Sequence, residues 1–161
     1  MIAPFALLAL RLAFQEPANN PPDITDETAT CAKPGSRPRV CARVFDDRGV
    51  AKVRVLFRAR GAKPYFAAEM TFDGARYCVS LPAPQKGTKS IEYYLEAVDS
   101  DFEPSRAVAK SLPIAGKCST PAPAEPAAPT AVTPVQPGEK LGGFDPATFS
   151  LPAPAGPSKG N

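Results

Sequence analysis

Histidine and tryptophan are both absent from this 161-residue chain. Without histidine there is no imidazole to act as a general base near neutral pH and no histidine to bind a metal, which excludes most hydrolase triads and many metal sites. Paired carboxylates could still cleave a glycosidic bond, but that chemistry needs a substrate cleft, which a small domain with short turns rarely offers. We therefore expect a protein that is not an enzyme and has no cofactor.

Cysteine is scarce, and its spacing is informative. None of the four cysteines belongs to a Cys-x-x-Cys unit, so neither a structural zinc site nor a thioredoxin-like redox pair is supported. We therefore expect the cysteines to form disulfides, and four cysteines can pair in three ways. The alternative is four free thiols in a cytosolic domain. The residues concerned are Cys31, Cys41, Cys78 and Cys118.

No apolar run is long enough to cross a bilayer as a helix, which needs about 20 residues. Residues Met1–Phe14 contain a shorter apolar run that Arg11 interrupts, which is typical of a signal peptide. An N-terminal helix of a cytosolic protein is the alternative, and the cysteines downstream favour export. We predict a secreted or periplasmic protein without a transmembrane span. Residues 15–30, which are proline-rich and acidic, are predicted to be an extended linker without secondary structure.

The middle of the chain has few prolines and alternates apolar with polar residues, which is the period of half-buried β-strands. The clearest strand runs from Ala51 to Arg60, where an apolar face alternates with a polar face. Leu56 is the one apolar residue on the polar face. Turn residues at 46–49 predict a first hairpin, and Asp73-Gly74 predicts a second. The other expected strands are 38–45, 65–72 (Phe66, Ala68, Met70 and Phe72 inward), 76–81, 90–98 and, more weakly, 106–114.

Ten of the 21 prolines follow Cys118, so residues 119–161 are predicted to be a disordered tail rich in proline and alanine. Near the end of the chain, Phe144, Phe149 and Leu151 stand among glycine and proline. They are either a short docking motif or incidental apolar residues in a disordered end, and the composition favours the second interpretation. Residues 31–118 are then the folded domain.

Six strands separated by turn residues, with no helical period, predict an all-β fold: an antiparallel two-sheet sandwich with disordered flanks. The segments Val44-x-Asp46-x-x-Gly49-Val50, Gly74-x-x-Tyr77 and Ile91-Glu92-Tyr93-Tyr94-x-Glu96-Ala97-x-Asp99 resemble immunoglobulin-like and fibronectin type III-like modules of bacterial secreted and cell-envelope proteins. That resemblance implies a non-catalytic binding or scaffold module of the cell envelope. The alternative is an accessory or inhibitor protein that docks on a secreted enzyme.

The resembled fold also carries two expectations about sites. It places the strands of Cys41 and Cys78 side by side, which implies one disulfide there, and Cys31–Cys118 would then join the two ends of the domain. It also gathers five carboxylates at one end, where they could bind calcium through oxygen ligands. Capping of turns by the same residues is the alternative, which the absence of a D-x-D-x-D-G loop favours. The five are Asp46, Asp47, Asp99, Asp101 and Glu103.

A stripe of four cations follows the polar face of the clearest strand: Lys52, Arg54, Arg58 and Arg60. It could bind a polyanion, or it could pair across strands with Glu69, Glu92 and Glu96, and we expect the pairing. Residues 31–118 have more positive than negative charges, so we expect the domain to be weakly attracted to anionic envelope polymers. The expected partner is a protein or an envelope polymer, and no nucleic-acid partner is expected. Tyr65, Tyr77 and Tyr94 are the aromatic residues that could support carbohydrate binding.

Overall fold

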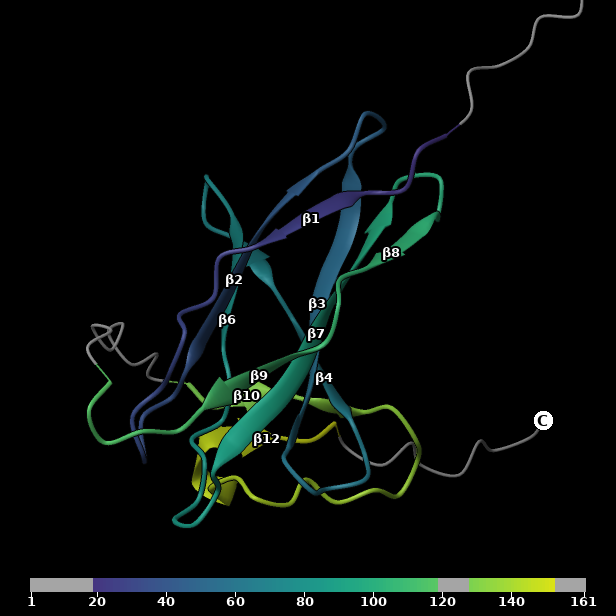
Figure 1. The fold of residues 1–161 in the computed structure, drawn as a ribbon. Coiled ribbons are helices and arrows are strands. Elements are labelled where there is room, and N and C mark those ends of the chain that lie inside the picture. The colour runs from purple at the N-terminus through teal and green to yellow at the C-terminus, as the bar shows by residue number, and fades with distance from the viewer. Residues whose placement is uncertain (1–18, 119–127, 153–161) are drawn as a thin grey trace, which may run out of the picture.

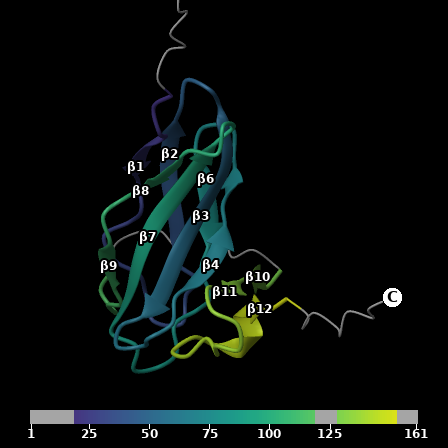
Figure 2. The same ribbon diagram turned by 90° about the vertical axis from the view of Figure 1, so that its right-hand side faces the viewer.

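The computed structural model describes residues 19–118 and 128–152, so the predicted signal peptide lies outside the described residues. Two antiparallel sheets form an all-β sandwich (Figure 1, Figure 2). The first sheet has the order β1-β2-β6-β5, and the second has the order β11-β4-β3-β7-β8, with β9 also paired to β7. The first sheet consists of β1 (Asp23–Asp26), β2 (Arg39–Phe45), β6 (Tyr77–Ser80) and β5 (Thr71–Phe72).

The second sheet is built on its two long central strands, β3 (Val50–Ala59) and β7 (Ser90–Asp99). Around them lie β4 (Phe66–Glu69), β8 (Pro104–Arg106), β9 (Lys110–Pro113) and β11 (Thr133–Pro134). The last described part of the chain adds β10 (Thr130–Ala131), which pairs in parallel with β12 (Phe149–Ser150), and the 3-10 helix η1 (Pro146–Thr148). Within the described ranges, no helix has the length and apolar character needed to span a membrane.

The core lies between the sheets, where the alternation predicted for β3 and β7 is confirmed. Val55 and Phe57 of β3 are fully buried, and they lie opposite Leu95 and Tyr93 of β7. Each large apolar side chain buried in this way contributes roughly 1.5–3 kcal/mol. Leu56 is an exception, because it is buried on the outer face of the sheet, where we expected solvent.

Two turn predictions have different outcomes. The hairpin at Asp73-Gly74 is confirmed: the amide of Asp73 donates to the carbonyl of Arg76 at 2.9 Å, and Gly74 has a φ of +100°, which favours glycine. The hairpin at residues 46–49 is wrong, because β2 and β3 belong to different sheets. Turn residues indicate that the chain reverses, but they do not indicate whether it returns to the same sheet.

The predicted third strand also changes sheets. It is continuous with the second sheet as far as Glu69 and joins the first sheet at Thr71, and Met70, between them, is buried. Phe72, which we expected in the core, is 55% exposed because the crossing turns its side chain outward, against the ring of Tyr77. The predicted sixth strand is likewise split into β8 and β9 by residues 107–109.

Residues 15–30 are not a linker throughout, because β1 pairs along its whole length with β2. Ile24 of β1 packs against the core, and this contact together with the backbone hydrogen bonds offsets the polar composition of the segment.

The prediction of a disordered tail is wrong for residues 128–152, which we call the C-terminal strap. Phe144 is 1% exposed and its ring meets Phe57 edge to face at 5.3 Å, while Val132 is also buried. β11 extends the second sheet beyond β4, and the strap, yellow-green in Figure 1, closes the lower end of the sandwich. The docking interpretation therefore holds for Phe144, whereas Phe149 is partly buried and Leu151 is 46% exposed.

Candidate binding surfaces

The outer face of the second sheet carries the cationic stripe, and the predicted pairing is present. Arg54 is 2.7 Å from Glu96, Arg58 is 2.8 Å from Glu92, and Lys52 is 3.1 Å from Glu69. The first two pairs are directly opposite each other on β3 and β7, so the register of the sheet creates them. Arg106 also pairs with Glu96. Each cation of the stripe except Arg60 is therefore paired with a carboxylate, whereas Arg60 makes no ion pair within the described part of the chain.

Tyrosine rings on this face are covered by arginines. The guanidinium carbon of Arg58 lies 4.4 Å from the ring centre of Tyr65, and that of Arg106 lies 4.6 Å from Tyr94. The two rings also meet edge to face at 5.1 Å. Desolvation raises the pKa of Tyr94, although the charge of Arg106 acts in the opposite direction. These rings are therefore engaged in cation–π contacts, in which a guanidinium covers one face of each ring.

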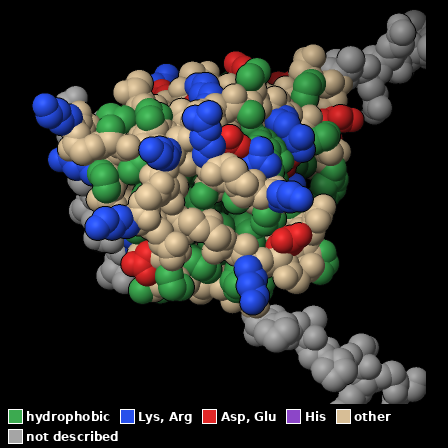
Figure 3. All heavy atoms as spheres, turned by 60° about the horizontal axis from the view of Figure 1, so that its bottom comes forward, with side chains coloured by type: hydrophobic (Ala, Val, Ile, Leu, Met, Phe, Trp, Pro, Cys, Tyr) green, Lys and Arg blue, Asp and Glu red, His purple; other side chains and the backbone are tan. Residues whose placement is uncertain are grey.

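A second group of cations lies at the lower end of the molecule, where the loops after β3 and before β7 meet the strap. These loops and the strap carry Arg60, Lys63, Lys86, Lys89 and Lys140. All five residues are exposed, and none forms an ion pair within the described residues. Figure 3 shows this end with many blue side chains and few red ones. We call these five residues the cationic end.

A hollow of about 440 Å³ lies in the middle of the cationic end. Arg60, Lys86 and Lys89 line it, together with Ala59, Ala62, Gln85, Gly87, Thr88, Gly142 and Gly143. The strap holds it in shape, because the amide of Gln85 and the hydroxyl of Thr88 both donate to the carbonyl of Gly143, at 2.9 and 2.8 Å. The nearby carboxylates of the strap are Glu139 and Asp145, and Asp145 caps η1. The cationic end thus keeps a positive balance.

The five carboxylates considered for calcium lie at the opposite end, but they do not form a metal-binding group in the part of the chain that the structure describes. Asp99 is completely buried, and both of its oxygens accept hydrogen bonds within the protein. Asp46 accepts from the amide of Arg48, and Asp101 is 3.3 Å from the Arg48 guanidinium. These contacts are those expected if the carboxylates cap turns. Burial acts to raise the pKa of Asp99, but its hydrogen-bond donors hold the pKa below its ordinary value.

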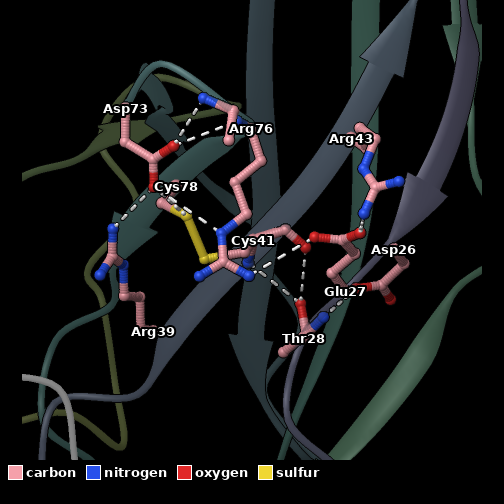
Figure 4. Close-up of polar contacts among 10 residues, drawn as sticks. Asp26, Glu27, Thr28, Arg39, Cys41, Arg43, Asp73, Arg76 and Cys78 are labelled. Carbon is pink, nitrogen blue, oxygen red and sulfur yellow. Dashed lines mark hydrogen bonds and ion pairs between the residues drawn. A yellow bond between two sulfur atoms is a disulfide. The ribbon is translucent and has the colours of Figure 1, made fainter.

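Both disulfides expected from the resemblance are present in the structure: Cys31–Cys118 and Cys41–Cys78. Cys41 and Cys78 are directly opposite each other on β2 and β6, on the outer face of the first sheet. They are nevertheless only 5% and 7% exposed. Figure 4 shows the side chain of Arg76 beside this disulfide, between Asp73 and Glu27.

The face around the Cys41–Cys78 bond carries a line of alternating charges. Asp73 lies 3.3 Å from Arg39 and 3.7 Å from Arg76, and Arg76 is 3.4 Å from Glu27, which also binds Arg43 (Figure 4). The backbone amides of Ala75 and Arg76, and then the two arginines, hold the pKa of Asp73 below its ordinary value. Because the charges alternate, this face has little net charge.

Next to it, a cavity of about 210 Å³ opens at the joined ends of the domain. Its apolar lining includes Leu112 and three disulfide-bonded cysteines, Cys31, Cys41 and Cys118. Its polar lining includes Glu27, Ser36 and four cations: Lys33, Arg37, Arg39 and Arg76. Arg37 is buried and donates to the carbonyl of Ala128 at 2.8 Å and to the hydroxyl of Thr130 at 2.5 Å, so it also anchors the strap.

A partly buried polar cluster joins the two sheets where β1 of the first sheet meets β7 and β9 of the second. Asp26 of β1 accepts from the hydroxyl of Tyr93 and from Lys110, both at 2.8 Å, and from the amide of Thr28 at 2.8 Å. Desolvation acts to raise the pKa of Asp26, but these donors outweigh it and hold the pKa below its ordinary value. Desolvation raises the pKa of Tyr93, and its bond to Asp26 adds to that increase. Neither group is held near neutral pH, as a general acid or base would be.

Sequence reasoning missed the cationic end, although a signal was present. Arg60 and Lys63 surround Gly61, Lys86 precedes Gly87, and Lys140 precedes Gly142, so cations stand beside turn glycines in all three segments. What the sequence does not indicate is that the strap returns to the sandwich and brings the third segment beside the other two.

Comparisons with known proteins identify no family. No protein-family model matches the chain, and no curated protein matches it. Among solved structures, one similar chain comes from a crystal structure of an engineered protein, and it matches this chain with 16% sequence identity and a TM-score of 0.45. The alignment covers 61% of this chain and 21% of that one, so this chain spans about a fifth of its length.

Proposed function

We propose that this protein is a non-catalytic, extracytoplasmic binding module of the cell envelope that attaches to an anionic polymer through its cationic end. The observation that carries the proposal is the contrast between two sets of cations. Three of the four stripe residues are paired with carboxylates. The fourth, Arg60, belongs to the cationic end, whose five cations make no ion pair within the described residues. Unpaired cations around a hollow attract a polyanion more strongly than a neutralised face does.

The compartment and the fold family belong to the same proposal. Disulfides form and persist in oxidising compartments, so the Cys31–Cys118 and Cys41–Cys78 bonds support export. In constant-type immunoglobulin domains, strands A, B, E and D form one sheet, and C, F and G form the other. The order β1-β2-β6-β5, and the part β3-β7-β8 of the second sheet, correspond to this arrangement and support the resemblance to immunoglobulin-like modules. The strands β4 and β11 extend the second sheet beyond β3.

Retention on an immobilised sulfated polymer tests the polymer-binding proposal. The wild-type protein is loaded on heparin at low salt and eluted with a sodium chloride gradient. An end variant with Arg60→Gln, Lys86→Gln and Lys89→Gln should elute much earlier, because screening and loss of charge weaken the same contacts. These three side chains are exposed, so the variant should keep the wild-type melting temperature.

The matched control is a stripe variant with Lys52→Gln, Arg54→Gln and Arg58→Gln, which loses the same formal charge. It should elute close to the wild type, because the removed cations were already paired with carboxylates. A melting curve must first show that the stripe variant is folded. Equal early elution of both variants would mean that retention follows net charge alone, and the proposal would then be wrong.

Docking on a secreted enzyme is the second candidate, and the 210 Å³ cavity favours it. Its lining combines Leu112 with Lys33, an exposed cation that makes no ion pair within the described residues, and this combination suits a carboxylate presented by a partner protein. A pull-down from native envelope extract, with a Lys33→Gln variant as the control, separates the candidates. A stoichiometric complex with one enzyme, lost in that variant, supports docking; recovery of envelope polymer with both proteins supports the first proposal.

A further inference from the structure

Phe102 occupies the tip of the loop between β7 and β8, with 83% of its surface exposed. Within the described residues it is the one non-glycine residue with a positive φ, +68°. A left-handed backbone is unfavourable for a residue with a Cβ, and an exposed ring gains nothing from burial. Isolated exposed apolar residues are ordinary on protein surfaces. An exposed phenylalanine in a backbone conformation that favours glycine is unusual, because neither its exposure nor its conformation stabilises the fold.

The loop that presents Phe102 is held by a buried carboxylate. One oxygen of Asp99 accepts the backbone amides of Asp101 and Glu103, at 2.9 and 2.7 Å, and the other accepts the side-chain amide of Asn19 at 2.7 Å. The amide of Phe102 donates to the carbonyl of Asp99 at 3.2 Å. These bonds fix the backbone on both sides of Phe102, so the loop presents its side chain from a defined position at the tip. A loop whose backbone is already fixed loses less conformational freedom on binding than a mobile loop does.

The hollow of the cationic end lies at the other end of the same strands. β3 runs along the length of the sandwich (Figure 2). It begins at Val50, opposite Asp99, and ends at Ala59, which lines the hollow. A cavity of about 150 Å³ is sufficient for benzene. The hollow, at about 440 Å³, exceeds that volume, and its lining of alanines, glycines and cations suits an aromatic face.

We propose that Phe102 of one copy inserts into this hollow of a second copy, which joins the modules head to tail. The charges are complementary, because Glu103 follows Phe102 and makes no ion pair within the described residues, while Arg60, Lys86 and Lys89 line the hollow. Asp101, on the other side of Phe102, is paired with Arg48. The two contacting surfaces are different, so the contact is heterologous and leaves a free tip and a free hollow at the ends of each assembly. This inference goes beyond polymer binding, and it predicts that an anionic polymer competes with self-association for the cationic end.

Sedimentation velocity on the purified full chain tests the inference. Weight-average mass should rise with concentration between about 10 µM and about 1 mM, the range of a weak contact, and the rise should disappear at high salt. A tip variant, Phe102→Gly, should remain monomeric and melt at a higher temperature, because glycine relieves the left-handed backbone. A hollow variant, Lys86→Glu with Lys89→Glu, should also remain monomeric. Val108→Ala, which alters an 85% exposed residue between β8 and β9, should associate like the wild type.

Mixing the two defective variants gives the decisive result. The tip variant keeps an intact hollow and the hollow variant keeps an intact tip, so together they should form a one-to-one dimer and nothing larger. A wild-type protein that stays monomeric throughout the concentration range, or a mixture that stays monomeric, would overturn the inference. So would association that persists in Phe102→Gly. Since that variant keeps the whole cationic end, its retention on heparin should be unchanged, so failure of this inference is distinguishable from failure of the polymer-binding proposal.

Discussion

The hydroxyl of Tyr93 donates a 2.8 Å hydrogen bond to a carboxylate oxygen of Asp26, and this bond connects the two sheets. Asp26 belongs to the edge strand of the first sheet, whereas Tyr93 and Lys110 belong to the second. The Asp26 side chain is 7% exposed while that of Lys110 is 52% exposed, so solvent weakens the ion pair but not the hydrogen bond. The bond holds β1 in place at the side where the sandwich would otherwise open.

Acid should weaken this connection. The pKa of Asp26 is lowered in the folded protein, so its contribution to stability is complete above the unfolded-state pKa and is lost as the pH falls through the folded-state pKa. The free energy of unfolding, measured by urea titration from pH 7 to pH 2, should fall in the acidic range below about pH 4. Asp26→Asn should cost about 1–3 kcal/mol at pH 7 and flatten that fall. Asp73 and Asp99 shift in the same direction, so some acid dependence should remain.

The control for Asp26 is Asp47→Asn, which removes an exposed carboxylate that makes no ion pair in the described part of the protein. It should leave both the stability at pH 7 and the acid dependence close to those of the wild type. If Asp26→Asn and Asp47→Asn have the same pH profile, Asp26 does not stabilise the folded state as described.

Alanine should destabilise the protein more at Gly143 than at Gly138. Both have a φ of +82°, but a Cβ at Gly143 would lie 2.4 Å from the Cβ of Ala59, whereas nothing lies within 4 Å at Gly138. Both alanine substitutions incur the left-handed penalty, and Gly143→Ala also overpacks the contact, which typically costs a further 1–3 kcal/mol or so. Thermal melts of the two variants should therefore differ clearly. Equal melting temperatures would show that the strap does not lie against β3.

Phe144→Ala tests whether the strap belongs to the folded unit. Removing a fully buried phenylalanine that packs on Phe57 should cost about 3–5 kcal/mol. Leu151→Ala, at a residue 46% exposed, should cost less than about 1 kcal/mol. Chemical denaturation with a single cooperative transition in both variants provides the measurement; a neutral effect of Phe144→Ala would show that the domain folds without the strap.

Peptide mapping under non-reducing conditions should recover Cys31–Cys118 and Cys41–Cys78. Each bond constrains the unfolded chain and should contribute at most about 4–5 kcal/mol, with the longer loop of Cys31–Cys118 contributing more. Recovery of a Cys31–Cys41 peptide instead would contradict the connectivity, because Cys41 would then be unavailable to its cross-strand neighbour.

The parts of the fold that could be predicted are those whose burial has a simple period. β3 and β7 lie in the middle of a sheet with one face toward the core, so Val53, Val55, Ile91 and Leu95 alternate regularly with polar residues. β1 could not be predicted in the same way, because Ile24 is its single apolar residue and the partner β2 supplies much of its stabilisation. Phe72 was misplaced because a strand that changes sheets shifts which side chains face inward.

The strap and the cationic end depend on contacts that composition hides. Proline and glycine predict that residues 128–152 lack a core of their own, and that is correct. Val132 and Phe144, however, enter the core of the sandwich individually, and a single aromatic residue has no periodicity from which to infer its burial. The ion pairs of the stripe were predictable because the register of adjacent strands places opposite charges together.

The salt dependence of polymer binding tests the central claim most directly. Affinity for a soluble labelled polyanion is measured at several sodium chloride concentrations for the wild type, the end variant and the stripe variant. Each cation that contacts the polymer adds roughly 0.7–0.9 to the slope of log affinity against log salt. We predict that the end variant loses a slope of about two to three, whereas the line for the stripe variant stays parallel to the wild type. A slope that is lost in the stripe variant and kept in the end variant would contradict the account.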